Sequence, residues 1–156
     1  MKKIYLILNN LRSMENVGSI FRTADAAGVK KIYLCGTTPK PPRKEIDKAA
    51  LGAVDFVQWE YRGSAIDLIH ELKKKNIPIF ALEQTENCVV YNTVKYPNEL
   101  ALIVGNEVDG VDSSLINLTD MVIEIPMLGQ KNSLNVAVAT GIAVFEIRNY
   151  KFLISK

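Results

Sequence analysis

Three segments of the chain combine polar side chains that could do chemistry with glycines that let a ligand come close to the backbone. They are Asn16–Gly28, Leu102–Gly110 and Ile123–Asn135. The side chains in them that could bind or orient a reacting group are Arg22, Asn16, Glu107, Ser133 and Asn135. We predict that the three segments together form the functional site of the protein.

The first segment has the features of a capped helix. Asn16 is a good N-cap for it, and Gly28 is a good C-terminal stop. Arg22 lies off the apolar face and either pairs with Asp25 three residues later or faces a ligand. The first turn offers free backbone N–H groups beyond a strand end, where a phosphate binds well, and Gly18 would let that ligand approach.

The second segment is a buried strand that runs into a polar turn. One interpretation is turn chemistry alone, because Asp109-Gly110 favours an unusual backbone conformation. The other is a ligand site, because Glu107 comes directly after a central apolar strand. Gly105, at the strand end, would let a flat ligand lie against the backbone.

The third segment joins the last predicted strand to the last predicted helix. Ser133 is an acceptable N-cap for that helix, and Asn135 is a polar residue that should have a specific partner. The helix itself is apolar nearly all round, so most of its sides must be buried. At the end of so short a chain, this composition predicts packing against a second subunit.

The elements that must position these segments alternate between strands and helices. This alternation predicts an α/β domain with a mostly parallel sheet and helices on both faces, where ligands bind beyond the carboxyl ends of the strands. The predicted strands are Ile4–Leu8, Lys31–Cys35, Val54–Trp59, Ile77–Leu82, Leu100–Val104 and Met121–Ile125. The predicted helices are Val17–Ala27, Glu45–Leu51, Ser64–Lys75, Ser114–Leu118 and Leu134–Tyr150. No repeat or linker divides the chain, so residues 1–156 are predicted to form a single domain.

Several classes of function are disfavoured. The chain has no GxxxxGK[ST] motif and no GxGxxG after its first strand, which argues against a P-loop enzyme or an ordinary dinucleotide dehydrogenase. Cys35, Cys88 and His70 are too few for a disulfide framework or a metal site, so we predict no metal. No apolar run is long enough for a membrane span or a signal peptide, and a cytoplasmic location is expected.

The charge is modest and unevenly placed. A net charge of +2 does not by itself indicate a nucleic-acid-binding protein. Lys40, Arg43, Lys44 and Lys48 form a local basic loop, for which phosphate contact and ordinary solvation are both open interpretations. The run at residues 73–75 ends a predicted helix, where cations suit the helix dipole.

Taken together, the three segments resemble the SpoU (TrmH-like) family of RNA ribose 2′-O-methyltransferases, within the SPOUT class. Asn16 and Arg22 match the family's N-x5-R helix. Residues 105–110 match its GNE-x2-G turn, and residues 125–136 match its IPM-x-G-x3-SLN-V element. The resemblance covers about residues 3–150, which is essentially the catalytic domain of the family.

The resemblance implies a C-terminal trefoil knot, a homodimer and S-adenosylmethionine (AdoMet) as the cofactor. By motif position, the residues that it implies around the cofactor are Leu82, Gly105, Ile125, Met127 and Leu134. It also implies RNA as the partner, with tRNA the leading substrate and rRNA the next. No separate RNA-binding domain is expected in this chain, so the catalytic dimer, or a partner protein, must recognise the RNA.

Arg22 matches the family's proposed catalytic residue. Because a guanidinium stays protonated in proteins, we prefer Arg22 as the anchor of the RNA phosphate beside the reactive ribose. Asn16 would fix Arg22 or the phosphate, and Glu107 would orient the arginine or the RNA. Ser133 and Asn135 would complete the polar site, with Ser133 near the methyl donor. The alternatives are a non-catalytic RNA-binding protein with the same fold, and a different small-molecule enzyme.

Overall fold

Seven strands form one sheet in which every hydrogen-bonded pair is parallel, in the order β3-β2-β1-β6-β4-β7-β5. The computed structural model describes residues 1–148. The strands are β1 (Lys3–Asn9), β2 (Lys31–Cys35), β3 (Trp59–Arg62), β4 (Ile79–Leu82), β5 (Val89–Val90), β6 (Glu99–Val104) and β7 (Met121–Glu124). The predicted parallel α/β fold is confirmed.

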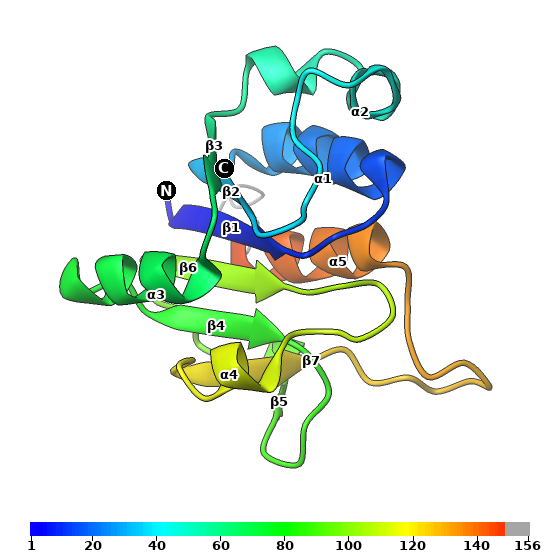
Figure 1. Cartoon of the computed structure of the whole chain (residues 1–156). Coiled ribbons are helices and arrows are strands. Elements are labelled where there is room, and N and C mark those ends of the chain that lie inside the picture. Colours follow the sequence, from blue (N-terminus) through cyan, green and yellow to red (C-terminus); the bar gives the residue numbers. More distant parts are fainter. Residues whose placement is uncertain (149–156) are drawn as a thin grey trace, which may run out of the picture.

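Helices cover both faces of the sheet (Figure 1). One face packs against α1 (Met14–Ala27), α2 (Lys44–Ala50) and α5 (Val136–Arg148), and the other packs against α3 (Ala65–Lys74) and α4 (Ser113–Ile116). Strand β1 shows why both faces are needed, since Leu6 and Leu8 belong to the first core and Ile7 to the second. All three are fully buried, as expected for a central parallel strand.

The predicted strand Val54–Trp59 is wrong. Residues Ala53–Asp55 form a 3-10 helix, and the strand begins only at Trp59. Ala53 and Val57 are the buried residues of this stretch, and the N–H of Val57 donates to the carbonyl of Ala53 at 3.0 Å. Apolar residues four apart suit a helical turn, whereas a half-buried strand needs them two apart.

The ends of two functional helices differ from the sequence prediction. Helix α1 begins at Met14 rather than Val17, and α5 begins at Val136 rather than Leu134. Tyr150, the predicted end of the last helix, lies outside the described residues. The short strand β5 was not predicted, because a two-residue strand has no periodicity to detect. The trefoil knot and the single-domain boundary stay predictions.

Cys35 is buried at the end of β2, Cys88 is half-buried in a loop, and neither forms a disulfide. Among residues 1–148, no helix has both the length and the hydropathy that a bilayer crossing needs.

Candidate functional site

A cavity of about 520 Å³ opens where strands β4, β6 and β7 end. All five residues predicted around a cofactor line it: Leu82, Gly105, Ile125, Met127 and Leu134. Of the predicted polar residues, Glu107 and Ser133 also line the cavity, while Asn16, Asn135 and Arg22 do not. The sequence prediction therefore located one real cavity, although its polar residues divide between the cavity and its surroundings.

The turn after β6 forms one wall of the cavity. Asn106 and Gly110 exchange backbone hydrogen bonds of 3.0 and 2.9 Å, and the side chain of Asn106 accepts from the N–H of Val108 at 2.8 Å. Gly110 has a φ of 72°, which confirms the predicted turn conformation. A Cβ on Gly105 would lie 2.2 Å from the carbonyl oxygen of Gly110, so Gly105 is needed to close the turn itself.

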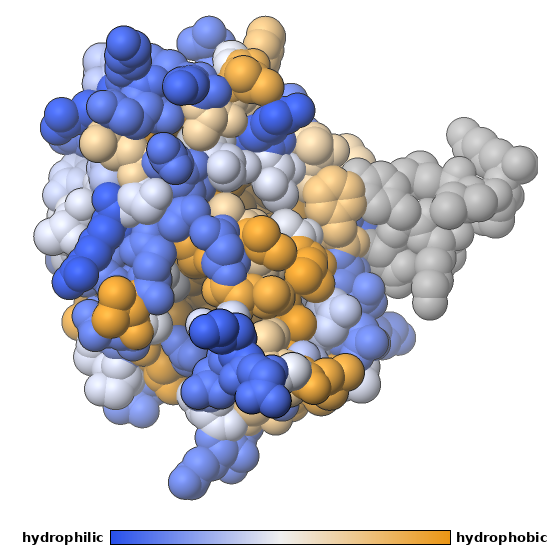
Figure 2. Space-filling model, turned by 90° about the vertical axis from the view of Figure 1, so that its right-hand side faces the viewer, coloured by the Kyte–Doolittle hydropathy of each residue, from blue (hydrophilic) through white to orange (hydrophobic). Residues whose placement is uncertain are grey.

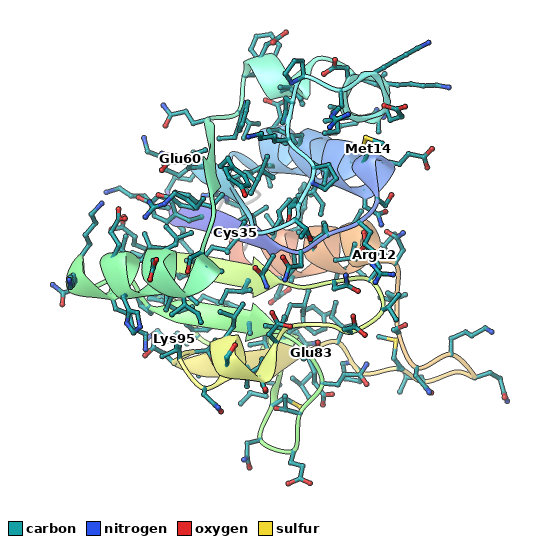
Figure 3. The ribbon with its side chains drawn as sticks, in the orientation of Figure 1. Arg12, Met14, Cys35, Glu60, Glu83 and Lys95 are labelled. Atoms are coloured by element: carbon teal, nitrogen blue, oxygen red, sulfur yellow. The ribbon has the colours of Figure 1, made fainter. Side chains whose placement is uncertain are left out.

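Glu83 holds this turn against β4, and sequence analysis missed it. Its carboxylate accepts from the N–H of Val111 at 2.9 Å and from the N–H of Gln84 at 2.8 Å. A Cβ on Gly110 would lie 2.1 Å from Glu83 Oε2, so the glycine and the carboxylate fit each other. Figure 3 labels Glu83 just beyond the end of β4. Its position directly after a buried strand is the same signal that drew attention to Glu107.

The carboxylate of Glu107 accepts hydrogen bonds from residues at the start of α1. Oε1 accepts from the N–H of Ser13 at 3.0 Å, and Oε2 accepts from the N–H of Arg12 at 2.9 Å. The side-chain amide of Asn16 donates to Oε1 at 3.2 Å. Burial alone would raise the pKa of Glu107, but these three donors outweigh it and hold the pKa below its usual value. Glu107 therefore bonds the backbone just before α1, and Ser13 Oγ takes the N–H of Asn16 in the first turn, so a phosphate site at this helix end stays a prediction.

Two asparagines join the first segment to the third. Asn135 Nδ2 donates to Asn16 Oδ1 at 3.0 Å, and Asn135 Oδ1 accepts from the N–H groups of Ala137 and Val138 at 2.9 and 3.2 Å. Hydrogen bonds thus run from Glu107 through Asn16 and Asn135 to the first turn of α5. The three segments meet through side chains that lie far apart in the sequence.

Both predicted N-caps are wrong, although Asn16 belongs to the hydrogen-bond network of the site and Ser133 lines the cavity. The side chain of Ser13 caps α1 and accepts from the N–H of Asn16, which lies inside the helix. At α5 the capping side chain belongs to Asn135 and not to Ser133. Either residue type suits a cap, so the side chain that caps depends on where packing lets the helix begin.

Arg22 lies on the exposed side of α1 and outside the cavity. It forms no ion pair with Asp25 in the part of the chain that the structure describes, so that alternative is not supported. Its neighbour Thr23 packs near α5, where a Cβ on Gly141 would lie 3.7 Å from the Thr23 methyl carbon. Gly18 faces α2 instead of a ligand, since a Cβ there would lie 2.4 Å from the carbonyl oxygen of Ile46. The expected ligand approach at Gly18 is therefore wrong.

A match to a protein-family profile identifies the family of this chain. Residues 3–145, nearly the whole chain, match the profile of the SpoU rRNA Methylase family. The chain belongs to the SpoU rRNA methylase family. The motifs that match are those that surround the cavity and the Glu107–Asn16–Asn135 network.

Relatives of this SpoU family member carry the names of RNA methyltransferases. A tRNA (guanosine(18)-2′-O)-methyltransferase from Aquifex aeolicus is 30% identical over 96% of this chain and 71% of its own length. The 23S rRNA (guanosine(2553)-2′-O)-methyltransferase RlmP from Bacillus subtilis is 33% identical over 92% and 57%. The AdoMet-bound rRNA methyltransferase from Sinorhizobium meliloti superposes with a TM-score of 0.89, at 33% identity over 96% and 57%. The chain thus spans little more than half the length of the last two.

One face of this SpoU-family chain is apolar and exposed. Helix α5 exposes 52% of Val138 and 41% of Phe145, and Leu134 just before it is 40% exposed. Figure 2, which views the molecule from the side to which the strand arrows of Figure 1 point, shows an orange apolar patch at its centre. A contiguous apolar surface of this kind marks an interaction site.

Among residues 1–148, no group of three His, Cys, Asp or Glu side chains is placed to hold a metal ion.

Proposed function

We propose that this protein is an AdoMet-dependent RNA methyltransferase that transfers a methyl group to a ribose 2′-hydroxyl. The observation that carries the proposal is the cavity at the ends of β4, β6 and β7. It is built from the family's motifs, and it combines apolar walls with negative charge.

The lining of the cavity suits AdoMet better than a nucleotide phosphate. Leu82, Ile125 and Leu134 provide apolar walls for an adenine ring. The main chain of residues 126–134 belongs to no helix or strand, and apart from the carbonyl of Asn132, which accepts from the Gln84 side chain at 2.8 Å, its polar groups can serve the polar edge of the base. Four carboxylates line the cavity: Glu83, Glu107, Asp109 and Glu124. The described lining contains no Lys, Arg or His. This negative charge favours a cationic sulfonium and disfavours a phosphate group.

The side chains of this chain would position the RNA rather than activate the methyl group. The cofactor supplies an electrophilic methyl group when it is bound. Arg22 binds the phosphate beside the target ribose and so fixes the 2′-hydroxyl. Glu107, Asn16 and Asn135 join the N-terminal ends of α1 and α5 by hydrogen bonds, and Ser133, which lines the cavity, would help to hold the cofactor there.

We infer that the active form is a homodimer whose sites are shared. Arg22 lies outside the cavity of its own chain, and an apolar surface on α5 lies beside it. A second copy packed on α5 would bury that surface and bring Arg22 of one subunit to the cavity of the other. A two-fold symmetric contact would build two such sites at once.

The proposed substrate is RNA, with tRNA as the leading candidate and rRNA as the next. The proposed location of the reaction is the cytoplasm. The relatives named above include enzymes for both RNA classes. The competing proposal is a non-catalytic RNA-binding protein on the same fold, which the retention of Arg22, Glu107, Ser133 and Asn135 opposes.

Calorimetry with AdoMet, NAD and ATP tests the cavity. We expect AdoMet alone to bind, and Leu134→Trp to abolish binding because the larger ring fills the cavity. Leu128→Trp is the matched control, since Leu128 is 97% exposed and does not line the cavity. Tighter binding of NAD or ATP than of AdoMet would overturn the cofactor assignment.

Subunit mixing tests the shared site. Arg22→Ala and Leu134→Trp should each be inactive alone, because one lacks the phosphate anchor and the other lacks the cofactor. After the two are mixed, unfolded and refolded together, a shared site predicts about a quarter of wild-type activity, since half the dimers then contain one intact site. No recovery in the mixed dimers would show that each site is made by one chain.

A further inference from the structure

A loop with unpaired positive charges lies beside the candidate site. Residues 36–44, which join β2 to α2 and include the first residue of α2, contain Lys40, Arg43 and Lys44 and no carboxylate. All three side chains are exposed, and none forms an ion pair within residues 1–148. The ion pairs of the described chain involve cations elsewhere: Lys3, Lys31, Arg62, Lys73 and Lys75.

The loop is held in place by buried hydrogen bonds. Thr38 is 3% exposed, and its hydroxyl donates to the carbonyl of Leu8 at 2.9 Å while it accepts from the N–H of Leu11 at 3.1 Å. The N–H of Thr37 donates to Asn10 Oδ1 at 3.0 Å. The cations are therefore presented from a fixed scaffold at the carboxyl ends of β1 and β2.

The same scaffold connects the loop to the cavity wall. Asn106 Nδ2, in the turn that lines the cavity, donates to the carbonyl oxygen of Asn10 at 2.9 Å. Asn10 thus bonds the basic loop through its side chain and the cavity turn through its backbone. Arg12, also exposed, lies two residues further along, between the loop and the end of α1. Figure 3 labels Arg12 on this side of the molecule.

An aromatic ring stands among these charges. Tyr61 on β3 is 40% exposed, and its hydroxyl donates to the carbonyl of Gly36 at 2.9 Å. Lys40 Nζ lies 4.3 Å from the centre of the ring. Proteins bind single-stranded nucleic acid with cations that lie along its phosphate backbone and with aromatic rings that stack on its bases. This loop and Tyr61 offer both.

We propose that the surface formed by Arg12, Lys40, Arg43, Lys44 and Tyr61 binds the RNA strand that flanks the target nucleotide. This inference rests on the proposed function and identifies where the RNA leaves the cavity. Three cations contact phosphates from the loop, Arg12 lies between the loop and the cavity, and Tyr61 offers the exposed part of its ring to a base. The carboxylates nearest in sequence, Glu45 and Asp47, lie in the first turn of α2, and neither forms an ion pair with these cations within residues 1–148.

Binding of fluorescently labelled bulk tRNA, and of fragmented rRNA in a second arm, tests the surface. The variant Lys40→Ala/Arg43→Ala/Lys44→Ala should bind RNA at least tenfold more weakly at low salt. Its plot of log affinity against log salt should be shallower by about 2, since each lost phosphate contact removes about 0.7 to 0.9 from the slope. AdoMet affinity should be unchanged, because none of the three residues lines the cavity.

The matched control removes three charges from the end of α3, which covers the other face of the sheet. Lys73→Ala/Lys74→Ala/Lys75→Ala, at the end of α3, should leave the salt slope as in the wild type. A loop variant that behaves like this control would overturn the surface. Tyr61→Leu should weaken RNA binding about fivefold while Tyr61→Phe keeps it, and equal binding by both would overturn the stacking role.

The outcomes separate this inference from the proposed function. If the wild type methylates RNA and the loop variant keeps its KM for RNA, the surface is wrong and the function stands. If the wild type binds RNA through the loop but methylates none, the surface stands and the proposed function is wrong.

Discussion

Replacing Glu107 with glutamine should loosen the junction between the cavity and the two helices beside it. In the native protein its carboxylate accepts from the backbone N–H groups of Arg12 and Ser13 and from the amide of Asn16. A glutamine oxygen can replace Oε1 and keep the bonds from Ser13 and Asn16. Its NH2 group then stands where Oε2 accepted from Arg12, so two donors face each other.

The structure allows the size of the effect to be worked out. The shorter contact of the Arg12 N–H, with Oε2 at 2.9 Å, is lost, while its longer contact of 3.2 Å with Oε1 and the bonds from Ser13 and Asn16 change from a charged to a neutral acceptor. A charged hydrogen bond contributes about 1.5 to 3 kcal/mol and a neutral one about 1 kcal/mol. Because the contacts to Arg12 and Ser13 are partly exposed, we expect the free energy of unfolding to fall by about 2 kcal/mol. Glu107→Ala, which leaves all three donors without this partner, should cost about 3 kcal/mol.

The effect should depend on pH. The folded-state pKa of Glu107 is lowered, so its stabilising contribution is complete above the unfolded value of about 4.3 and is lost as the pH falls through the folded-state pKa. The difference in unfolding free energy between wild type and Glu107→Gln should therefore be constant near neutral pH. It should shrink below about pH 4, where the wild-type carboxyl takes up a proton.

Urea unfolding, followed by fluorescence of Trp59 at one fixed protomer concentration, measures the difference. Trp59 is the only tryptophan in the chain. Glu86→Gln is the control, since Glu86 is exposed and accepts no hydrogen bond within residues 1–148. Equal stability of Glu107→Gln and wild type at pH 7, or a difference that persists unchanged at pH 3.5, would refute this account of Glu107.

Three further predictions follow from packing. Gly18→Ala should lower the free energy of unfolding by about 2 kcal/mol, because its Cβ meets a carbonyl of α2 at 2.4 Å; a melting temperature at or above the wild type would contradict this. Burial raises the pKa of Cys35 to about 12, so a thiol reagent should label only Cys88 in the folded protein, and two labels without denaturant would contradict it. If the proposed dimer packs through α5, Val138→Asp should give a monomer in analytical ultracentrifugation while Ile66→Asp on α3 keeps the mass of the wild type; equal masses for both variants would argue against α5 as the interface.

Sequence analysis was most successful where local pattern and motif coincide. The run of apolar residues in β6 and the turn that follows predicted both the central strand and the wall of the cavity. The five cofactor residues were predicted by motif position, and all of them line one cavity. The strand predicted over Val54–Trp59 failed because four apolar or aromatic residues in six fit a helical turn as well as a strand.

Long-range partners could not be predicted in the same way. Glu107 and Asn16 are 91 residues apart in the chain, and only the packing of α1 beside the end of β6 brings the carboxylate to the residues just before that helix. No local pattern near Asn16 could have predicted this partner. Glu83 was missed although it follows a buried strand, because no motif drew attention to it. Arg22 has no partner in the cavity of its own chain, a fact that only the three-dimensional placement reveals.

The central claim is that this cavity and Arg22 together methylate a ribose in RNA. The most direct measurement incubates the protein with AdoMet carrying an isotopically labelled methyl group and with tRNA and rRNA from cells that lack it, and then digests the RNA for nucleoside mass spectrometry. The account predicts a labelled 2′-O-methylnucleoside with the wild type and none with Arg22→Ala, which should still bind AdoMet. A label on a base, no label in either RNA, or full activity of Arg22→Ala would contradict it.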